Sequence, residues 1–252
     1  MLSDPLRWRL VHELGRSDRR VGELVQLVDK PQNLVSYHLA ELRRAGIVTA
    51  RRSSADGRDV YYRADLFRCR DLLGDAGRSL HPGLSLAPTP PTAAARRGVR
   101  PRLLFLCTGN SARSQIAEAL VEHRSAGTVE ARSAGSHPKP LHPNAVRVMA
   151  ERGVDLSDHT PKPLTRFARS RFERVITLCD KVREVCPDFP GTPTAAHWSI
   201  PDPAAAGDTD EATYPAFEAV ADQIERRVAL LLADLRSPGG SRCSRPDSTT
   251  SL

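Results

Sequence analysis

The sequence of 252 residues has no long hydrophobic run, because no stretch approaches the roughly 18 apolar residues that a membrane-spanning helix needs. Its first residues, MLSDPLRWRL, also lack the basic head and apolar core of a secretion signal. We find no internal repeat with a period of about 20 to 50 residues. These absences favour a soluble protein, and we expect it to be cytoplasmic.

Cysteine is also scarce, with five residues in the whole chain. In a reducing cytosol such cysteines are poor candidates for structural disulfides and better candidates for catalysis or metal binding. Cys243 lies in a polar C-terminal segment, so we assign it no role. The positions of the other four must decide between these functions.

The chain divides at a Pro-rich and Ala-rich segment, residues 81–101, whose composition is typical of a semi-extended linker. We therefore expect one domain at 1–80, a second at 102–236, and a disordered tail at 237–252. Charge is divided in the same way: residues 1–70 hold 14 Lys and Arg against 9 Asp and Glu, whereas 103–236 hold 16 against 18. The basic excess indicates that the N-terminal domain meets a polyanion.

Residues 1–80 show the pattern of short helices followed by a β hairpin. Apolar spacing predicts helices at 6–15, 21–28 and 31–45, the last ended by Gly46. Two β-rich arms then flank Asp56 and Gly57, a dipeptide suited to a tight turn. The predicted fold is a mainly α winged helix-turn-helix with a β wing.

The runs QNLVSYHLAELRRAGIV and DGRDVYYR resemble the ArsR-like winged-helix repressors, and the resemblance covers nearly all of residues 1–68. It implies a double-stranded DNA operator as partner and a homodimer that places two helices in the major groove. The residues that it assigns to DNA are Gln32, Asn33, Ser36 and Tyr37 for bases and Arg51, Arg52 and Arg58 for the backbone or minor groove.

One departure from these repressors concerns metal sensing. Many members carry paired cysteines in the helix that corresponds to 21–28, and this helix has none. Cys69 alone cannot supply a three-thiolate arsenite site. The inducer of the N-terminal domain, and the role of Cys69, therefore stay open.

Residues 102–236 alternate short buried strands with helices. Strands are expected at 103–107, in VEARSAG and in RVITLC, each followed by a helix. This order predicts a small α/β domain with a parallel sheet. Ligand sites in such sheets lie beyond the carboxyl ends of the strands, where Cys107 and Cys179 both fall.

The run from Cys107 to Ser114 has the composition of an oxyanion-binding loop. Cys107 ends a strand and a helix is expected to begin at Arg113 or Ser114, so the amides between them can converge on a tetrahedral anion. Arg113 would clamp two oxygens, and the Ser114 hydroxyl would stabilise the Cys107 thiolate. A thiolate beneath a bound oxyanion is suited to nucleophilic catalysis. The other loop members are Thr108, Gly109, Asn110, Ser111 and Ala112.

The run CTGNSARS, with RSAG at 132–135, resembles the low-molecular-weight tyrosine phosphatase superfamily over residues 102–235. The resemblance implies a flavodoxin-like parallel sheet. The runs TLCDKVREVCP and HWSIPDPA resemble the thioredoxin-coupled arsenate reductases of this superfamily. This implies arsenate as substrate and an external thioredoxin-like or glutaredoxin-like protein as reductant. We expect no bound cofactor and assign no metal site.

Reduction of arsenate needs two electrons, hence thiols beyond Cys107. Cys179 and Cys186 stand seven residues apart, which along a helix is about 10.5 Å, whereas a disulfide needs Cα atoms within roughly 7 Å. They can pair only if the helix unwinds. The resemblance implies a relay in which Cys107 attacks arsenate, Cys179 attacks the arsenylated thiol, and Cys186 resolves the intermediate, with Asp202 as proton donor.

Two alternatives stay open. A protein tyrosine phosphatase needs only the thiolate, an arginine and an acid, and a regulator could use the α/β domain as an oxyanion sensor. Intact Cys107, Arg113, Ser114 and Asp202 argue against a mere sensor. Three alanines follow Pro203, and a mouth without aromatic side chains suits a small inorganic oxyanion better than a phosphotyrosine.

Overall fold

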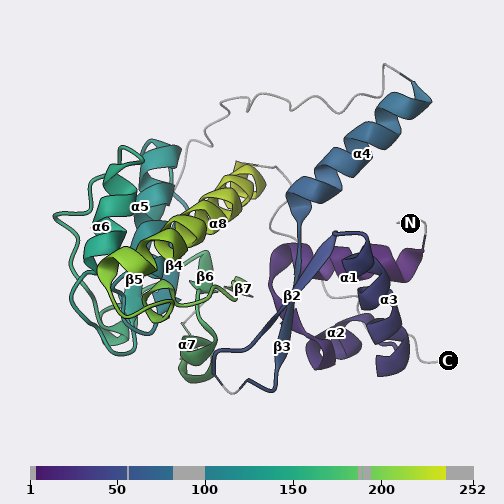
Figure 1. Cartoon of the computed structure of the whole chain (residues 1–252), viewed down its shortest axis with the longest axis horizontal. Helices are drawn as coiled ribbons and strands as arrows, with labels where there is room; N and C mark the ends of the chain where they lie inside the picture. Colours follow the sequence, from purple (N-terminus) through teal and green to yellow (C-terminus); the bar gives the residue numbers. More distant parts are fainter. Residues whose placement is uncertain (1–3, 56, 82–99, 187–188, 190–193, 237–252) are drawn as a thin grey trace.

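The computed structural model describes residues 4–55, 57–81, 100–186, 189 and 194–236, which form two folded units (Figure 1). Most of the expected linker at 81–101 lies outside the described residues. The whole of the expected tail at 237–252, including Cys243, also lies outside them, as does Asp56 of the expected turn. Within the described ranges, no helix combines the length and apolar character that crossing a membrane requires.

The N-terminal unit contains three helices where the apolar spacing predicts them, α1 Pro5–Arg16, α2 Val21–Val28 and α3 Gln32–Arg44. Asp4 begins α1, because its carboxylate accepts hydrogen bonds from the amides of Leu6 at 2.8 Å and Arg7 at 3.3 Å. Gly46, with a φ of +70°, ends the turn after α3. Apolar side chains from all three helices form one buried core.

The wing consists of β2 Val48–Arg52 and β3 Val60–Ala64, which pair antiparallel as predicted, and the Ser53 amide closes the hairpin on the Asp59 carbonyl at 2.8 Å. Two further elements of this unit were not predicted. The short strand β1 Arg19–Arg20 pairs with the other side of β3. Helix α4 Leu66–Leu80 follows the wing, and its Cys69 is buried in the winged-helix core.

The C-terminal unit is built on four parallel strands in the order β5-β4-β6-β7. Their bounds are β4 Arg102–Cys107, β5 Glu130–Gly135, β6 Arg174–Thr177 and β7 Thr194–His197. The interior strand β4 is buried over Leu103 to Cys107, as its continuous apolar run predicts. The predicted parallel α/β unit beside a winged helix is confirmed.

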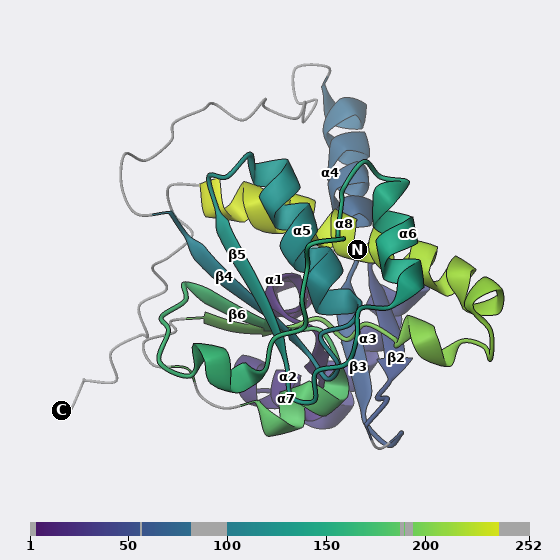
Figure 2. The same ribbon diagram turned by 90° about the vertical axis from the view of Figure 1, so that its left-hand side faces the viewer.

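Four helices complete this unit: α5 Arg113–Ser125, α6 Pro143–Ala150, α7 Asp180–Val185 and α8 Asp210–Arg236. Helices α5, α6 and α8 pack against one another, whereas α7 lies apart from them, beside the winged helix (Figure 2). Among the described residues of this unit, the connections include two short 3-10 turns, Leu164–Phe167 and Pro203–Ala205.

The two units are in direct contact. The Asp18 amide donates to the His197 carbonyl at 2.8 Å, and the His197 amide donates to the Ser17 hydroxyl at 2.9 Å. The Ser199 amide in turn donates to the Asp18 carboxylate at 2.7 Å, and Arg227 of α8 pairs with the same carboxylate at 2.9 Å. Residues 17–18 therefore continue the hydrogen bonding beside β7, and the wing reaches α7 (Figure 1).

Candidate active site

The loop between β4 and α5 is held from outside so that its amides can face a ligand. Every loop carbonyl from 108 to 112 accepts a hydrogen bond from a donor beyond the loop. The donors are the amides of His137 (2.8 Å, to 108), Lys139 (2.9 Å, to 109), His142 (2.9 Å, to 111) and Ile116 (2.9 Å, to 112), and the side-chain amide of Gln115 (3.2 Å, to 110). Because the carbonyls are occupied, the amide edge and the N-terminus of α5 are left to bind an anion.

The shape of the loop depends on Asn110 and Gly135. Asn110 adopts the left-handed conformation, with a φ of +46°, and its side-chain amide donates to the hydroxyls of Ser114 at 2.9 Å and Ser133 at 2.8 Å. Gly135 ends β5 against the loop, where a Cβ atom would lie 2.7 Å from the Thr108 carbonyl oxygen. The loop is therefore preorganised by contacts on both sides.

Cys107 lies at the base of this loop and is buried. Its Sγ is 2.9 Å from the Ser114 hydroxyl and accepts the Asn110 amide at 3.2 Å. Hydrogen bonds of this kind stabilise a thiolate, which is the nucleophilic form of cysteine. The predicted pairing of Cys107 with Ser114 is present.

Arg113 is the first residue of α5, and its guanidinium is buried. One nitrogen donates to the Ile200 carbonyl at 3.0 Å, and another lies 3.2 Å from the Asp202 carboxylate, which is half-exposed. The segment that follows β7 therefore brings Asp202 to the arginine of the loop. A carboxylate and the guanidinium of the loop therefore lie side by side.

The second cysteine also reaches the loop. The Sγ of Cys179 lies 3.2 Å from the hydroxyl of Thr108. Cys179 precedes the first residue of α7 and Cys186 follows its last, and both are thiols. The structure thus brings Cys179 to the site with Cys107, Arg113, Ser114 and Asp202, and leaves Cys186 at the opposite end of α7.

Sequence reasoning missed Asp180, which is fully buried beside Cys179. One carboxylate oxygen accepts from His197 at 3.0 Å and from the Ser199 hydroxyl at 2.7 Å, and the other accepts from Arg51 of the wing at 2.6 Å. Burial acts to raise the pKa of Asp180. This effect is outweighed by these hydrogen bonds, by a further hydrogen bond from the Ser54 amide and by the positive charge of Arg51, so the pKa of Asp180 lies far below its ordinary value. Asp180 is therefore a charged group shared by both units.

Sequence reasoning also missed a buried ion pair behind the loop. The ammonium group of Lys162 lies 3.1 Å from the carboxylate of Glu118, and the hydroxyl of Ser133 donates to the same carboxylate. Ser133 also accepts from Asn110, so the pair is connected to the oxyanion loop.

The expected DNA-contacting residues have two different environments. Gln32, Asn33, Ser36 and Tyr37 are exposed on one face of α3, and Arg52 and Arg58 are exposed on the wing. Arg51 departs from the expectation, because its guanidinium is engaged by Asp180 and Ser199 of the α/β unit. In this arrangement Arg51 is not available to a phosphate group.

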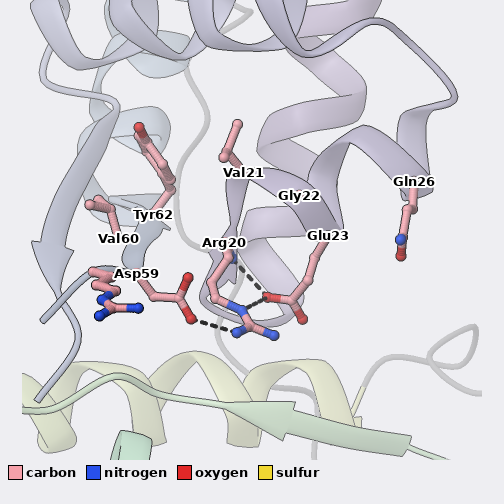
Figure 3. A pocket seen from close by; sticks show the side chains of 9 residues that line it. Arg20, Val21, Gly22, Glu23, Gln26, Asp59, Val60 and Tyr62 are labelled. Carbon is pink, nitrogen blue, oxygen red and sulfur yellow. Dashed lines mark hydrogen bonds and ion pairs between the residues drawn. The ribbon is translucent and has the colours of Figure 1, made fainter. Parts of the chain in front are cut away.

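A surface hollow of about 440 Å³ lies between α2 and the wing (Figure 3). Three of its charged residues are linked: the guanidinium of Arg20 lies 2.5 Å from the Asp59 carboxylate, and the backbone amide of Arg20 donates to the Glu23 carboxylate at 2.8 Å. The other carboxylate oxygen of Glu23 pairs with Arg183 of α7. The hollow therefore borders the contact between the two units.

Cys69 does not join any of these groups. It is buried in the winged-helix core, and burial together with the nearby Asp65 raises the pKa of its thiol. Cys69 is therefore a core residue of the winged helix.

A strand, an amide loop and a helix that carry a nucleophilic cysteine, an arginine and an acid define a cysteine-dependent enzyme acting on an oxyanion, here attached to a winged helix. Residues 102–239 match the low molecular weight phosphotyrosine protein phosphatase family, and the chain belongs to that family. Residues 4–50 match the arsR family of bacterial regulatory proteins.

The chain is similar to curated arsenate reductases. It is 39% identical to that of Shouchella clausii, 37% to that of Halalkalibacterium halodurans and 36% to that of Bacillus subtilis, each over 126 residues that span 50% of this chain and 91% of the relative. Among solved structures, an arsenate reductase in the oxidized state is 28% identical, with 53% of this chain and 98% of that chain covered and a TM-score of 0.47. The thioredoxin-dependent arsenate reductase of Corynebacterium glutamicum is 24% identical, with 90% of this chain and 96% of that chain covered and a TM-score of 0.44.

Proposed function

We propose that this chain reduces arsenate to arsenite through a cysteine relay and binds operator DNA through its winged helix. The main support for the enzymatic part of this proposal is a second thiol at the oxyanion loop: the Sγ of Cys179 lies 3.2 Å from the Thr108 hydroxyl. Hydrolysis of a phosphate ester has no use for that thiol, whereas reduction of arsenate needs it as an electron source. The similarity to curated arsenate reductases supports this choice over a phosphatase or an oxyanion sensor.

In the first step, the Cys107 thiolate attacks arsenic while the loop amides and Arg113 hold the other oxygens. A sulfur–arsenic bond forms and one oxygen leaves as water. Asp202, whose carboxylate lies 3.2 Å from the Arg113 guanidinium, gives the proton to that departing oxygen.

In the second step, Cys179 attacks the sulfur of Cys107. The sulfur–arsenic bond breaks with its electron pair on arsenic, so arsenite leaves and a disulfide joins Cys107 to Cys179. Cys186 then attacks the Cys179 sulfur and releases the Cys107 thiolate. Because Cys179 and Cys186 flank α7, this last exchange requires α7 to unwind.

An external dithiol must then return two electrons to the disulfide between Cys179 and Cys186. A thioredoxin-like protein is the reductant that we propose, since it attacks an exposed disulfide through its own thiolate. Val185 beside Cys186 is 60% exposed, so a protein partner can reach this end of α7. A glutaredoxin-like partner is the alternative that a reductant comparison distinguishes.

Two assays test the relay. With thioredoxin, thioredoxin reductase and NADPH, we expect arsenate-dependent NADPH oxidation by the natural chain and by a Cys243→Ser control, and none by Cys179→Ser or Cys186→Ser. Without reductant, Cys186→Ser should still release a single arsenite per chain, whereas Cys179→Ser should release none. Steady-state turnover by both variants would contradict the relay, and efficient hydrolysis of p-nitrophenyl phosphate without arsenate reduction would favour a phosphatase.

The regulatory half of the proposal depends on α3, where Gln32, Asn33, Ser36 and Tyr37 are exposed together and can reach base edges. We propose that a homodimer presents two such helices to a palindromic operator. Its test is salt-dependent binding to the DNA upstream of its own gene, with loss on Asn33→Ala. Absence of binding to that DNA and to other palindromic arsenic operators at low salt would refute it.

A further inference from the structure

The winged helix holds the beginning of α7, the helix that joins the two relay cysteines. Asp180, the first residue of α7, receives five hydrogen bonds, and three of them come from the wing. Arg51 donates to its carboxylate at 2.6 Å, and Ser54 donates through its amide at 2.7 Å and its hydroxyl at 3.0 Å. Because Asp180 follows Cys179 directly, this contact fixes the cysteine beside the oxyanion loop.

A second contact lies three residues further along α7. The guanidinium of Arg183 pairs with the carboxylate of Glu23 in α2 and lies over the ring of Tyr61, 5.2 Å from its centre. Figure 3 shows Glu23 at the edge of α2, where its other oxygen accepts the Arg20 amide. Both partners of this ion pair are largely buried, with 22% and 21% of their side chains exposed, so water screens the pair less than a surface pair.

These contacts belong to the wound form of α7. Seven residues of ideal helix rise about 10.5 Å, whereas a disulfide requires Cα atoms within roughly 7 Å. The turn that contains Arg183 must therefore unwind when the disulfide forms. Unwinding that turn removes Arg183 from Glu23 and from the face of Tyr61.

We propose that Glu23 and Arg51 of the DNA-binding unit are positioning residues of the reductase relay. They hold α7 wound, with Cys179 at the loop, and so favour the dithiol over the disulfide between Cys179 and Cys186. An interaction made in only one of two states shifts their equilibrium by its own free energy. This inference rests on the proposed function, because it takes α7 as the redox segment.

The test is a thiol–disulfide titration of the full-length chain. The chain is equilibrated in buffers of reduced and oxidised dithiothreitol, where two electrons and two protons pass from the cysteine pair to the oxidised reagent. The thiols of Cys179 and Cys186 are then trapped by alkylation and quantified by mass spectrometry. We expect Arg51→Met and Glu23→Gln each to shift the equilibrium about tenfold toward the disulfide, a potential lower by about 30 mV.

Matched controls separate positioning from general effects of charge. Arg70→Met removes an exposed pair with Asp71 in α4, and Glu41→Gln removes a pair within α3. Both controls should leave the equilibrium unchanged. Arg51→Lys keeps the positive charge, so its shift toward the disulfide should be smaller than that of Arg51→Met.

The outcomes distinguish this inference from the relay itself. If the natural chain forms no disulfide between Cys179 and Cys186 at any ratio of reduced to oxidised dithiothreitol, the relay itself is contradicted. A disulfide that forms equally in the natural chain and in both variants, or is weakened by them, overturns only the positioning role. If Arg51→Met does not fold, Glu23→Gln decides, because glutamine keeps an oxygen for the cap of α2.

Discussion

Substitution of Gly135 by alanine should damage the oxyanion loop without touching a reacting group. The added Cβ would lie 2.7 Å from the Thr108 carbonyl oxygen and 2.8 Å from the Asn110 amide nitrogen. Both neighbours are backbone atoms, so they cannot rotate away. Ordinary contact needs about 3.4 Å or more, so the loop must retreat from β5 by roughly 0.7 Å.

The cost follows from that displacement. Overpacking of this kind destabilises a fold by about 1–3 kcal/mol. A misplacement of about 1 Å near reacting groups costs on the order of 100-fold in rate, so we expect kcat/KM for arsenate to fall by about 10-fold to 100-fold in Gly135→Ala. The same displacement should weaken the protection that phosphate gives Cys107 against iodoacetamide.

Three measurements check this prediction: arsenate turnover, alkylation of Cys107 with increasing phosphate, and thermal unfolding. Gly22→Ala is the matched control, because a Cβ at Gly22 meets nothing within 4 Å and the residue lies inside α2. That control should keep its activity and gain up to about 1 kcal/mol of stability. Unchanged turnover and phosphate protection in Gly135→Ala would show that β5 does not shape the loop.

Two further predictions concern buried charges. Burial lowers the pKa of His197 below its ordinary value, so the folded chain keeps the ring neutral where the unfolded chain takes up a proton. The contribution of His197 to the free energy of unfolding should therefore be full above pH ~6.5 and should fall as the pH decreases below it. Melting temperatures between pH 8 and 5 measure this slope, and His197→Gln should reduce it; an equal slope in the variant would assign it to other groups. Lys162→Met leaves the buried carboxylate of Glu118 without its ammonium partner and should cost about 3–5 kcal/mol in urea unfolding at pH 7. Adding Glu118→Gln should recover much of that loss, and no recovery would mean that packing of the lysine stem dominates.

The parts of the site that could be predicted are those that neighbouring residues determine. A strand, a glycine-containing loop and a helix follow one another from 102 to 125, so Cys107, Arg113 and Ser114 come together through local geometry alone. Cys179 and Asp202 lie far along the chain. Their roles came from the resemblance to known reductases, and the structure places both beside the loop.

The parts that could not be predicted depend on contacts between distant residues. Arg51 and Asp180 are 129 positions apart, and an arginine in a wing has the same local pattern whether it faces DNA or a carboxylate. Strand β7 is four residues long and contains two alanines, which have little β propensity. Helix α4 contains two glycines and many charges, so its helical period is weak.

The hydrogen bonds of Asp180 bear on whether the two halves are separable. Deleting residues 1–80 would leave this fully buried carboxylate with two of its five donors and would bring Ser199 and His197 into water. The Pro-rich segment at 81–101 thus separates two regions of the sequence, but it does not separate two units that unfold independently. We expect the two halves to unfold in one thermal transition. Neither half is then an independent module that can be grafted onto another protein.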